Sequence, residues 1–562
     1  MKIYIADSGE TLKIIAHNYR VDLNEMMIEN PHIVYSDQNI GGSIIKIPSS
    51  VISSRNHKNE PQFVQKIGSD AAADSVNACP PQPPVVPLDN WIPLTPLETM
   101  EKTDYDVVII GSGAGGGAVL WRLCEQWRNS GKRVCVLEAG DLLLQDHIHN
   151  LPTFNVDRIR RYLNNPKYAV PIGEDIPEYP GAKLFLALGG KTIHWGGISP
   201  RLQPIDFINW PITYNDLVPY YLIAERIMNV NLGYTSESSL QKVLLERLSK
   251  IGYGSATAQP RAVDLQITKF GNVHSSVFFS SILFMSYCLN LRGFDLAVRA
   301  PVIEVLTEKG KAVGVKVVTP EKKVHYIKGK TIVLSAGAFQ NPRILFNSGI
   351  QGEAIGRYLI NHSFVTIRPT TNRDQFPENL GVLGILIPRS KEMNYQVQLN
   401  GPHPYEYYHY QEEPLMKELQ FSFSGYGVIE PRRDNYIYLD PAIRDEYGLP
   451  KINIHFSYSE RDWAVIRQMA TAITDMIPRI GLTMHGKPCL MPPGIEYHES
   501  GTCRMGDNQA TSVTNRYCQM HNISGLYVAD TSVLPSIGAA NPTLTTVAVA
   551  IRTADYIIQQ LS

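Results

Sequence analysis

The chain has 562 residues, which is too long for one compact domain and indicates two to four folding units. Hydrophobic residues make up 44% and charged residues 19%, as in an ordinary globular protein that buries large cores. Lys and Arg total 52 against 53 for Asp and Glu, so the composition argues against a basic surface for nucleic acid or for an anionic membrane.

The cysteines and the N-terminal residues indicate in which compartment the protein is located. Seven cysteines occur without a CxxC pair, so we expect neither a disulfide framework nor a bound metal. The first residues, MKIYIADSGETL, lack the basic and then apolar pattern of a signal peptide. The stretch Val107–Trp121 is weakly charged but too rich in glycine to cross a bilayer. The sequence therefore predicts no membrane span and a cytoplasmic protein.

Residues 1–48 form a self-contained pattern of strand, helix, helix and strand. The short motifs SGETL, ENP and IKIP within this pattern resemble those of a LysM module. The resemblance implies binding to glycans that contain N-acetylglucosamine, such as peptidoglycan or chitin. The alternative is a degenerate module that serves only docking or stability. Such a module without a signal peptide also resembles proteins deposited on bacterial spores, so location at a spore or cell wall stays open.

Residues 49–103 are predicted to be a linker. The segment CPPQPPVVP places five prolines in nine positions, which favours an extended, semi-rigid spacer.

From residue 104 the pattern is α/β. The segment YDVVII indicates a buried parallel strand, GSGAGGGAVLWRLCEQW a glycine turn that enters a helix, and RVCVLEAG the next strand. A later strand, KTIVLSAGA, also ends in a glycine turn. We expect a doubly wound nucleotide-binding domain built from residues 104–360 and 497–562. Residues 361–496 are polar and rich in Tyr and Pro, and they predict an interleaved α+β substrate domain with an antiparallel sheet.

The glycine turn predicts dinucleotide binding. Gly111 would permit the tight turn, Gly113 would let the backbone approach a pyrophosphate, and Gly116 would let helix and strand pack closely. Glu138 ends the second strand, 22 residues beyond Gly116, where a carboxylate can accept hydrogen bonds from ribose hydroxyls. An acid at this position favours FAD or NAD over NADP.

Four motifs are spread from the glycine turn to the C-terminus. They are the glycine turn itself, SAGAFQNPRILFNSGI at 335–350, GRYLINH at 356–362, and a C-terminal pair, YHESGTCRMG with GLYVADTSVLPSIGAANPTL. These motifs and their order resemble those of the glucose–methanol–choline (GMC) family of flavin oxidoreductases, and the resemblance covers about 460 residues. The resemblance implies FAD as cofactor and oxidation of a carbinol by hydride transfer to the flavin N5.

The resemblance also assigns site residues. His498 matches the family's active-site histidine and Asn541 its partner, filled by His or Asn among relatives. A neutral imidazole suits the role of base for the hydroxyl proton, and an amide can donate a hydrogen bond to the substrate oxygen. Asp530 matches an acid near the flavin phosphate. A further set, expected beside the isoalloxazine, is Ala540, Pro542 and Thr543. We expect His521 to be structural.

The segment LGGKTIHWGGISPR resembles the sugar-oxidising branch of the family, which includes pyranose oxidases. The resemblance implies that His194, Trp195 and Gly196 pack against the flavin. In some relatives the matching histidine is bonded covalently to the flavin; here we expect a non-covalent neighbour. Pyranose oxidases tend to carry a hydroxyl side chain at the position of Gly196, so the electron acceptor stays open between O₂ and a quinone-type molecule.

The resulting hypothesis is FAD-dependent oxidation of a secondary hydroxyl of a sugar or glycoside, with His498 as base. One alternative is a GMC enzyme for a non-sugar alcohol. The other is a catalytically silent, glycan-binding coat or scaffold protein.

Overall fold

The computed structural model describes the chain apart from residues 1, 7–8, 20, 31–32, 34–35, 41–42, 48–87, 152–155, 237, 269–270, 376–380 and 404–416. It divides into two compact units, Met1–Val86 and Pro87–Ser562. Most of the predicted linker lies outside the described residues.

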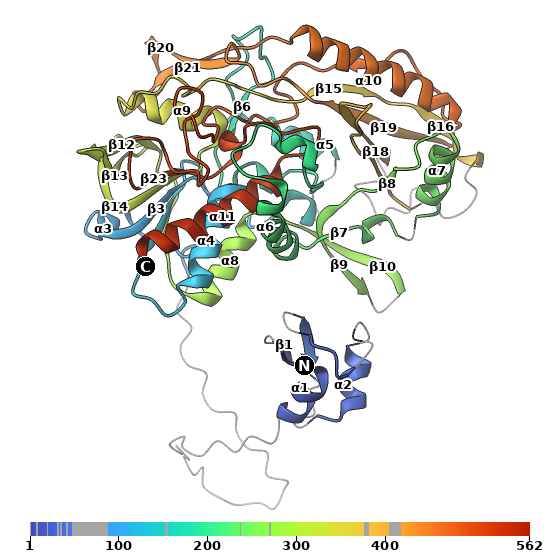
Figure 1. Ribbon diagram of the computed structural model, residues 1–562, viewed down its shortest axis with the longest axis horizontal. Helices are drawn as coiled ribbons and strands as arrows, with labels where there is room; N and C mark the ends of the chain where they lie inside the picture. The colour runs from blue at the N-terminus through green and yellow to red at the C-terminus, as the bar shows by residue number, and fades with distance from the viewer. Residues whose placement is uncertain are drawn as a thin grey trace, which may run out of the picture. The chain divides into compact units, whose positions relative to one another are not determined.

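The N-terminal unit has the predicted order of elements: β1 (Lys2–Ile5), α1 (Leu12–Tyr19), α2 (Leu23–Glu29) and β2 (Ile44–Ile47) (Figure 1). The two strands pair antiparallel. Asn30, fully buried, ends α2 and ties it to β2: its Nδ2 donates to the carbonyls of Met26 (2.7 Å) and Lys46 (2.8 Å). Its Oδ1 accepts from the Lys46 amide. The Asn of the ENP motif therefore holds this small core together.

The larger unit contains a mixed seven-stranded sheet in the order β11-β4-β3-β14-β13-β12, with β23 also paired to β14. Its parallel strands are β11 (Asp295–Ala297), β4 (Val134–Leu137), β3 (Tyr105–Ile110), the second half of β14 (Val324–Leu334) and β23 (Leu526–Val528). The first half of β14 pairs antiparallel with β13 (Lys311–Val318), which pairs with β12 (Val302–Glu308). The sheet is therefore parallel around the glycine turn and antiparallel beyond it.

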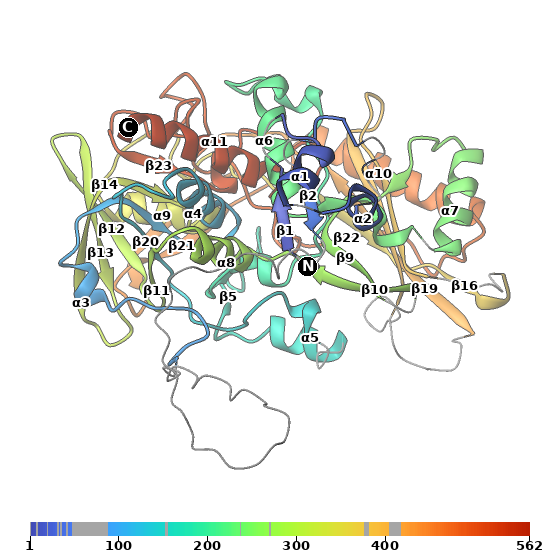
Figure 2. The same ribbon diagram turned by 90° about the horizontal axis from the view of Figure 1, so that it is seen from below.

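Helices cover this sheet. The helix α4 (Ala114–Gln126) follows β3 and packs against α8 (Ile282–Leu291) and α11 (Thr543–Leu561), and α11 also packs against α6 (Tyr214–Ile227). Figures 1 and 2 both show α11 alongside α4, although the two are far apart in the sequence. The whole of β3 is buried, as expected for a strand at the centre of such a layer.

A second, antiparallel sheet has the order β22-β15-β19-β18-β17-β8, with β16 paired to β19. Its strands are β22 (Cys489–Leu490), β15 (Ser363–Ile367), β19 (Glu418–Gly427), β18 (Tyr395–His403), β17 (Leu383–Ile387), β8 (Thr257–Ala258) and β16 (Thr370–Asn372). The helix α10 (Glu460–Arg479) packs on β19 and β15, and α7 (Ser239–Lys250) on β17. All strands of this sheet except β8 lie within the predicted substrate domain.

Shorter elements complete the unit: α3 (Leu97–Met100), α5 (Val156–Leu163), α9 (Gly337–Asn347), β5 (Ala169–Pro171), β6 (Lys183–Phe185), β7 (Val230–Asn231), β9 (Arg261–Thr268), β10 (Gly271–Phe278), β20 (Tyr436–Arg444) and β21 (Pro450–His455). Leu97 and Met100 of α3 are buried in the main core, together with Ile92. The predicted linker, residues 49–103, is therefore too long at its C-terminal end, because its last dozen residues pack on the larger unit.

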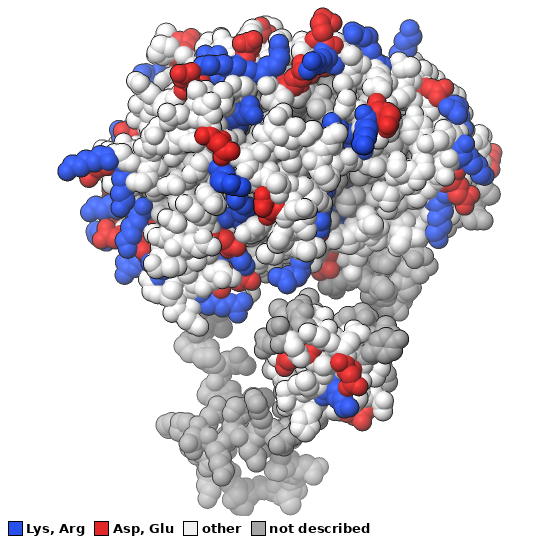
Figure 3. Space-filling model, in the orientation of Figure 1, with Lys and Arg blue, Asp and Glu red and all other residues white. Residues whose placement is uncertain are grey.

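The surface agrees with the balanced composition. Figure 3 shows Lys and Arg side chains interspersed with Asp and Glu on the face of the larger unit. Among the described residues, no helix has the length and apolar character needed to cross a bilayer. The same residues contain no cluster of His, Cys, Asp and Glu that could hold a metal.

Candidate active site

A cavity of about 950 Å³ lies where the glycine turn and the second sheet meet. Most of the predicted site residues line it: Gly111, Gly113, Glu138, His194, Trp195, Gly196, His498, Asp530, Asn541, Pro542 and Thr543. Gly116 and Ala540 are not on its wall; both are buried in the packing around it. Residues distant in the sequence are thus gathered around one space, which is at the upper end of the range for small-molecule pockets.

The glycines of the turn differ in what surrounds the position that a Cβ would occupy. Gly111 has φ +95°, and a Cβ there would lie 2.4 Å from the Ser335 carbonyl oxygen. A Cβ on Gly116 would lie 2.0 Å from the carbonyl oxygen of Gly111, so this glycine lets α4 pack against the turn. A Cβ on Gly113 would meet nothing within 4 Å. Sequence reasoning missed Gly115, where a Cβ would lie 1.8 Å from the Ala529 carbonyl oxygen.

Two buried carboxylates organise the turns at the ends of the parallel strands. Glu138 accepts from the Ser112 amide (3.0 Å) and hydroxyl (2.5 Å), and from the Gly140 amide (2.7 Å). A carboxylate has about four acceptor positions, so Glu138 retains room for a ligand hydroxyl. Burial raises the pKa of Glu138, and these three hydrogen bonds oppose that effect.

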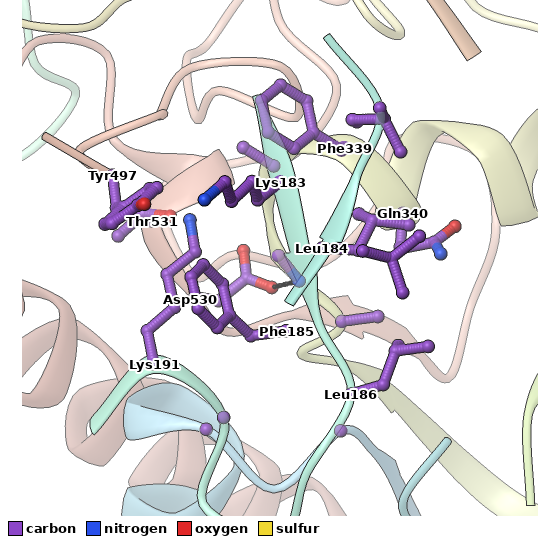
Figure 4. Close-up of a pocket in the computed structure, with 18 of the residues that line it drawn as sticks. Lys183, Leu184, Phe185, Leu186, Lys191, Phe339, Gln340, Tyr497, Asp530 and Thr531 are labelled. Atoms are coloured by element: carbon purple, nitrogen blue, oxygen red, sulfur yellow. Dashed lines mark hydrogen bonds between the residues drawn. The ribbon is translucent and has the colours of Figure 1, made fainter. Parts of the chain in front are cut away.

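Asp530 lies two residues after β23 and links its own turn to the start of α9. It accepts from the Gly337 amide at 2.7 Å, from Asn341 Nδ2 at 2.7 Å and from the Ser532 amide and hydroxyl at 2.9 and 2.5 Å. Burial raises the pKa of Asp530. Figure 4 shows Asp530 and Lys191 on one side of the strand β6 and Gln340 of α9 on the other.

The cavity wall has the features that a dinucleotide requires. Gly113 begins α4 without a side-chain cap, so the first amides of this 13-residue helix are open to an anion. The open space at the Gly113 Cβ position leaves the backbone accessible to a phosphate. The residues present therefore fit a dinucleotide such as FAD: open helix amides face the cavity, and Glu138 keeps an acceptor position for a ligand hydroxyl.

His194 ends the short 3₁₀ segment Gly190–Ile193 and packs its ring 4.5 Å from that of Phe185. Burial, followed by the charge of Lys191, lowers the pKa of His194 to about 3, so its imidazole is neutral. Its Nδ1 is buried and has no hydrogen-bond partner in the described part of the chain. The neighbouring Trp195 donates a hydrogen bond from its Nε1 to the Phe279 carbonyl oxygen (2.7 Å).

We expect the flavin to be held at His194 without a covalent bond. Neither Gly196 nor Gly197 has a side chain that could restrict His194 to one position against the flavin, which favours a non-covalent neighbour. Acid precipitation should therefore release the yellow colour to the supernatant. Yellow colour retained in the pellet, with a polypeptide mass raised by one FAD, would show a covalent adduct instead.

His498 and Asn541 lie side by side on the cavity wall. The His498 Nε2 is 3.4 Å from the Asn541 Nδ2, and the His498 Nδ1 is 2.9 Å from the Nδ1 of His362. The Asn541 Oδ1 accepts from Gln396 Nε2 (3.1 Å) and Gln398 Nε2 (2.6 Å) of β18. Burial and then His362 hold the pKa of His498 well below 6.5, so it is present as the neutral imidazole.

Three of these neighbours were missed by sequence reasoning. The His362 ring is buried and ends the GRYLINH motif, which carried no assigned role for it. Gln396 and Gln398 are two buried polar residues at alternate positions of an apolar strand, and that alternation was the available signal. His521 contacts the Ser512 hydroxyl at 2.9 Å and is not on the cavity wall, which agrees with its expected structural role.

The fold and the cavity define an α/β protein with a dinucleotide-type glycine turn, in which one cavity is lined by both the parallel strands' turns and the antiparallel sheet. Family models described as GMC oxidoreductase match residues 188–364 and 431–550, which together make up more than half of the chain. The chain belongs to the GMC oxidoreductase family. It is an FAD-dependent enzyme that acts on CH–OH groups.

The individual relatives share only about a quarter of their residues with this chain. The chain is 26% identical to a 2-methyl-1,2-propanediol dehydrogenase of Mycolicibacterium austroafricanum, over 83% of this chain and 97% of the relative. It is also 26% identical to a C-glycoside 3-oxidase of Arthrobacter globiformis, over 71% of this chain and 79% of the relative. A variant of the formate oxidase of Aspergillus oryzae has a similar structure, with a TM-score of 0.61 at 16% identity, over 82% of this chain and 98% of that one. That structural likeness concerns the fold alone.

Proposed function

We propose that this enzyme oxidises a secondary hydroxyl of a sugar or glycoside, with His498 as the base. The observation that carries the proposal is the pairing of His498 Nε2 and Asn541 Nδ2, 3.4 Å apart on the cavity wall. The choice of a sugar is supported by the LGGKTIHWGGISPR segment and by the relative named C-glycoside 3-oxidase.

His498 and Asn541 have different roles toward the substrate hydroxyl. The neutral His498 imidazole accepts the hydroxyl proton, which is possible because its low pKa leaves it unprotonated at neutral pH. The Asn541 amide donates a hydrogen bond to the same oxygen and stabilises its developing negative charge. The flavin, when bound, supplies the acceptor for the hydride that leaves the adjacent carbon. The oxygen then becomes the carbonyl of a ketone.

A non-sugar alcohol is the second candidate, because one of the two relatives is named for a diol. Anaerobic mixing with monosaccharides, glycosides, diols and aryl alcohols, followed at the flavin absorption band, separates the candidates. We expect fast bleaching with a sugar or glycoside. Bleaching by diols or aryl alcohols alone would favour the second candidate, and bleaching by none would favour a silent scaffold protein. Subsequent mixing with air or with a quinone identifies the acceptor.

We propose that the N-terminal unit is a LysM-like module that attaches the enzyme to peptidoglycan or a chitin-like glycan, at a spore surface or cell wall. It has its own hydrophobic core, which includes Leu12, Ile15, Met26, Ile45 and Ile47. A module with a separate core and a proline-rich connection can bind while the enzyme unit works independently.

Deleting Met1–Val86 should leave the turnover of a small soluble substrate within about twofold of the full chain, because the two units are compact by themselves. Retention on insoluble peptidoglycan or chitin in a sedimentation assay should be lost. Equal retention of the full and the shortened chain would show that the unit does not bind these glycans.

A further inference from the structure

His362 lies outside the cavity wall but contacts the proposed base directly. It immediately precedes β15, its side chain is buried, and its ring is 5.0 Å from that of His498 in an edge-to-face arrangement. Its two nitrogens have different partners: Nδ1 is 2.9 Å from His498 Nδ1, and Nε2 is 3.1 Å from the carbonyl oxygen of Gly538. Burial lowers the pKa of His362 to about 4, so this ring is also neutral.

These partners determine where each proton lies. A carbonyl oxygen can only accept, so the proton of neutral His362 is on Nε2 and points to Gly538. Nδ1 of His362 is then an acceptor, and the Nδ1 of His498 is the atom that donates to it. A neutral imidazole has one N–H, so the Nε2 of His498 carries the lone pair. That is the nitrogen beside Asn541.

Asn541 is oriented by the same kind of constraint. Its Oδ1 accepts hydrogen bonds from the amide groups of both Gln396 and Gln398. Since the oxygen is committed to these two donors, the Nδ2 faces His498. The cavity therefore presents one acceptor and one donor next to each other, which is the complement of a hydroxyl group.

We infer that His362 is a positioning residue: it donates from Nε2 to the Gly538 carbonyl and accepts at Nδ1 from His498, and it thereby fixes the tautomer in which His498 Nε2 can take a proton. Gln396 and Gln398 fix the amide of Asn541 in the same way. This inference rests on the proposed function for its catalytic meaning, whereas the tautomer itself is a property of the protein.

The most direct test is neutron diffraction from deuterated crystals of the FAD-bound enzyme at neutral pH. We expect deuterium on Nδ1 of His498 and on Nε2 of His362, and none on Nε2 of His498. Deuterium on Nε2 of His498 would overturn the inference whether or not the enzyme oxidises sugars. Rapid and wild-type-like flavin reduction in a His498→Ala variant would instead contradict the proposed function and leave the tautomer assignment standing.

A kinetic test uses His362→Leu, which removes both hydrogen bonds, and His362→Gln, whose amide offers an acceptor and a donor in the spacing of the imidazole nitrogens. Loss of the correct tautomer costs a serine protease about 10⁴ in kcat, so we expect His362→Leu to slow flavin reduction on the order of 10²-fold. FAD content and KM should change little, and His362→Gln should recover at least about tenfold. As a matched control, His485→Gln alters a histidine that contacts Thr370 and is not on the cavity wall. Wild-type rates in His362→Leu, or equal losses in the Leu and Gln variants with normal FAD content, would overturn the inference.

Discussion

His498→Ala is expected to retain FAD and to lose nearly all flavin reduction. In the proposed mechanism the imidazole accepts the hydroxyl proton, whereas the glycine turn and the buried carboxylates that would hold the cofactor come from other segments of the same cavity wall. Loss of a general base typically lowers a rate about 10²- to 10⁴-fold, so the anaerobic rate of flavin bleaching should fall by that amount. The measurement is stopped-flow absorption with the best substrate from the panel.

His521→Ala is the matched control, because His521 belongs to the same C-terminal region but contacts the Ser512 hydroxyl and is not on the cavity wall. It should reduce its flavin at close to the wild-type rate. If His498→Ala did so as well, His498 could not be the base.

Gly113→Val is expected to give a folded protein that fails to load FAD. Its backbone has φ −65° and ψ −168°, which any residue can adopt, and a Cβ there meets nothing within 4 Å. The added side chain would instead occupy the space where the open amides of α4 face the cavity. We expect at least about a tenfold loss in FAD affinity, equivalent to about 1.4 kcal/mol, with an unchanged melting temperature of the FAD-free protein.

Gly131→Val serves as the control, since Gly131 is exposed, away from the cavity, and also has open space at its Cβ position. It should load FAD normally. Gly115→Ala should behave differently from both, because its Cβ would collide with the Ala529 carbonyl and destabilise the fold itself. Normal FAD loading by Gly113→Val would mean that the phosphate does not approach this glycine.

The residues expected to bind the cofactor could be predicted because they lie close together in the sequence. Gly111, Gly113 and Gly116 act within one strand–turn–helix unit, and Glu138 ends the next strand, so spacing alone indicates a nucleotide site. His498 and Asn541 came from a family resemblance; the structure now brings them within 3.4 Å.

The residues that hydrogen-bond to His498 and Asn541 could not be predicted from local sequence patterns. His362 meets His498 across 136 positions of sequence, and Gln396 meets Asn541 across 145. Such contacts depend on how the antiparallel sheet docks against the C-terminal segment, which no periodicity encodes. The end of the linker was missed for a similar reason: Ile92 and Leu97 become core residues only because they pack on the distant sheet.

The product of one anaerobic turnover shows whether the enzyme oxidises a secondary hydroxyl of a sugar. The enzyme is mixed with the glycoside that bleaches its flavin fastest, and the product is analysed by ¹³C NMR. We predict one ring ketone for each flavin reduced, because removal of a proton and a hydride from a secondary carbinol leaves a ketone. An aldehyde at a primary carbon, or a reduced flavin without any keto sugar, would rule out oxidation of a secondary hydroxyl.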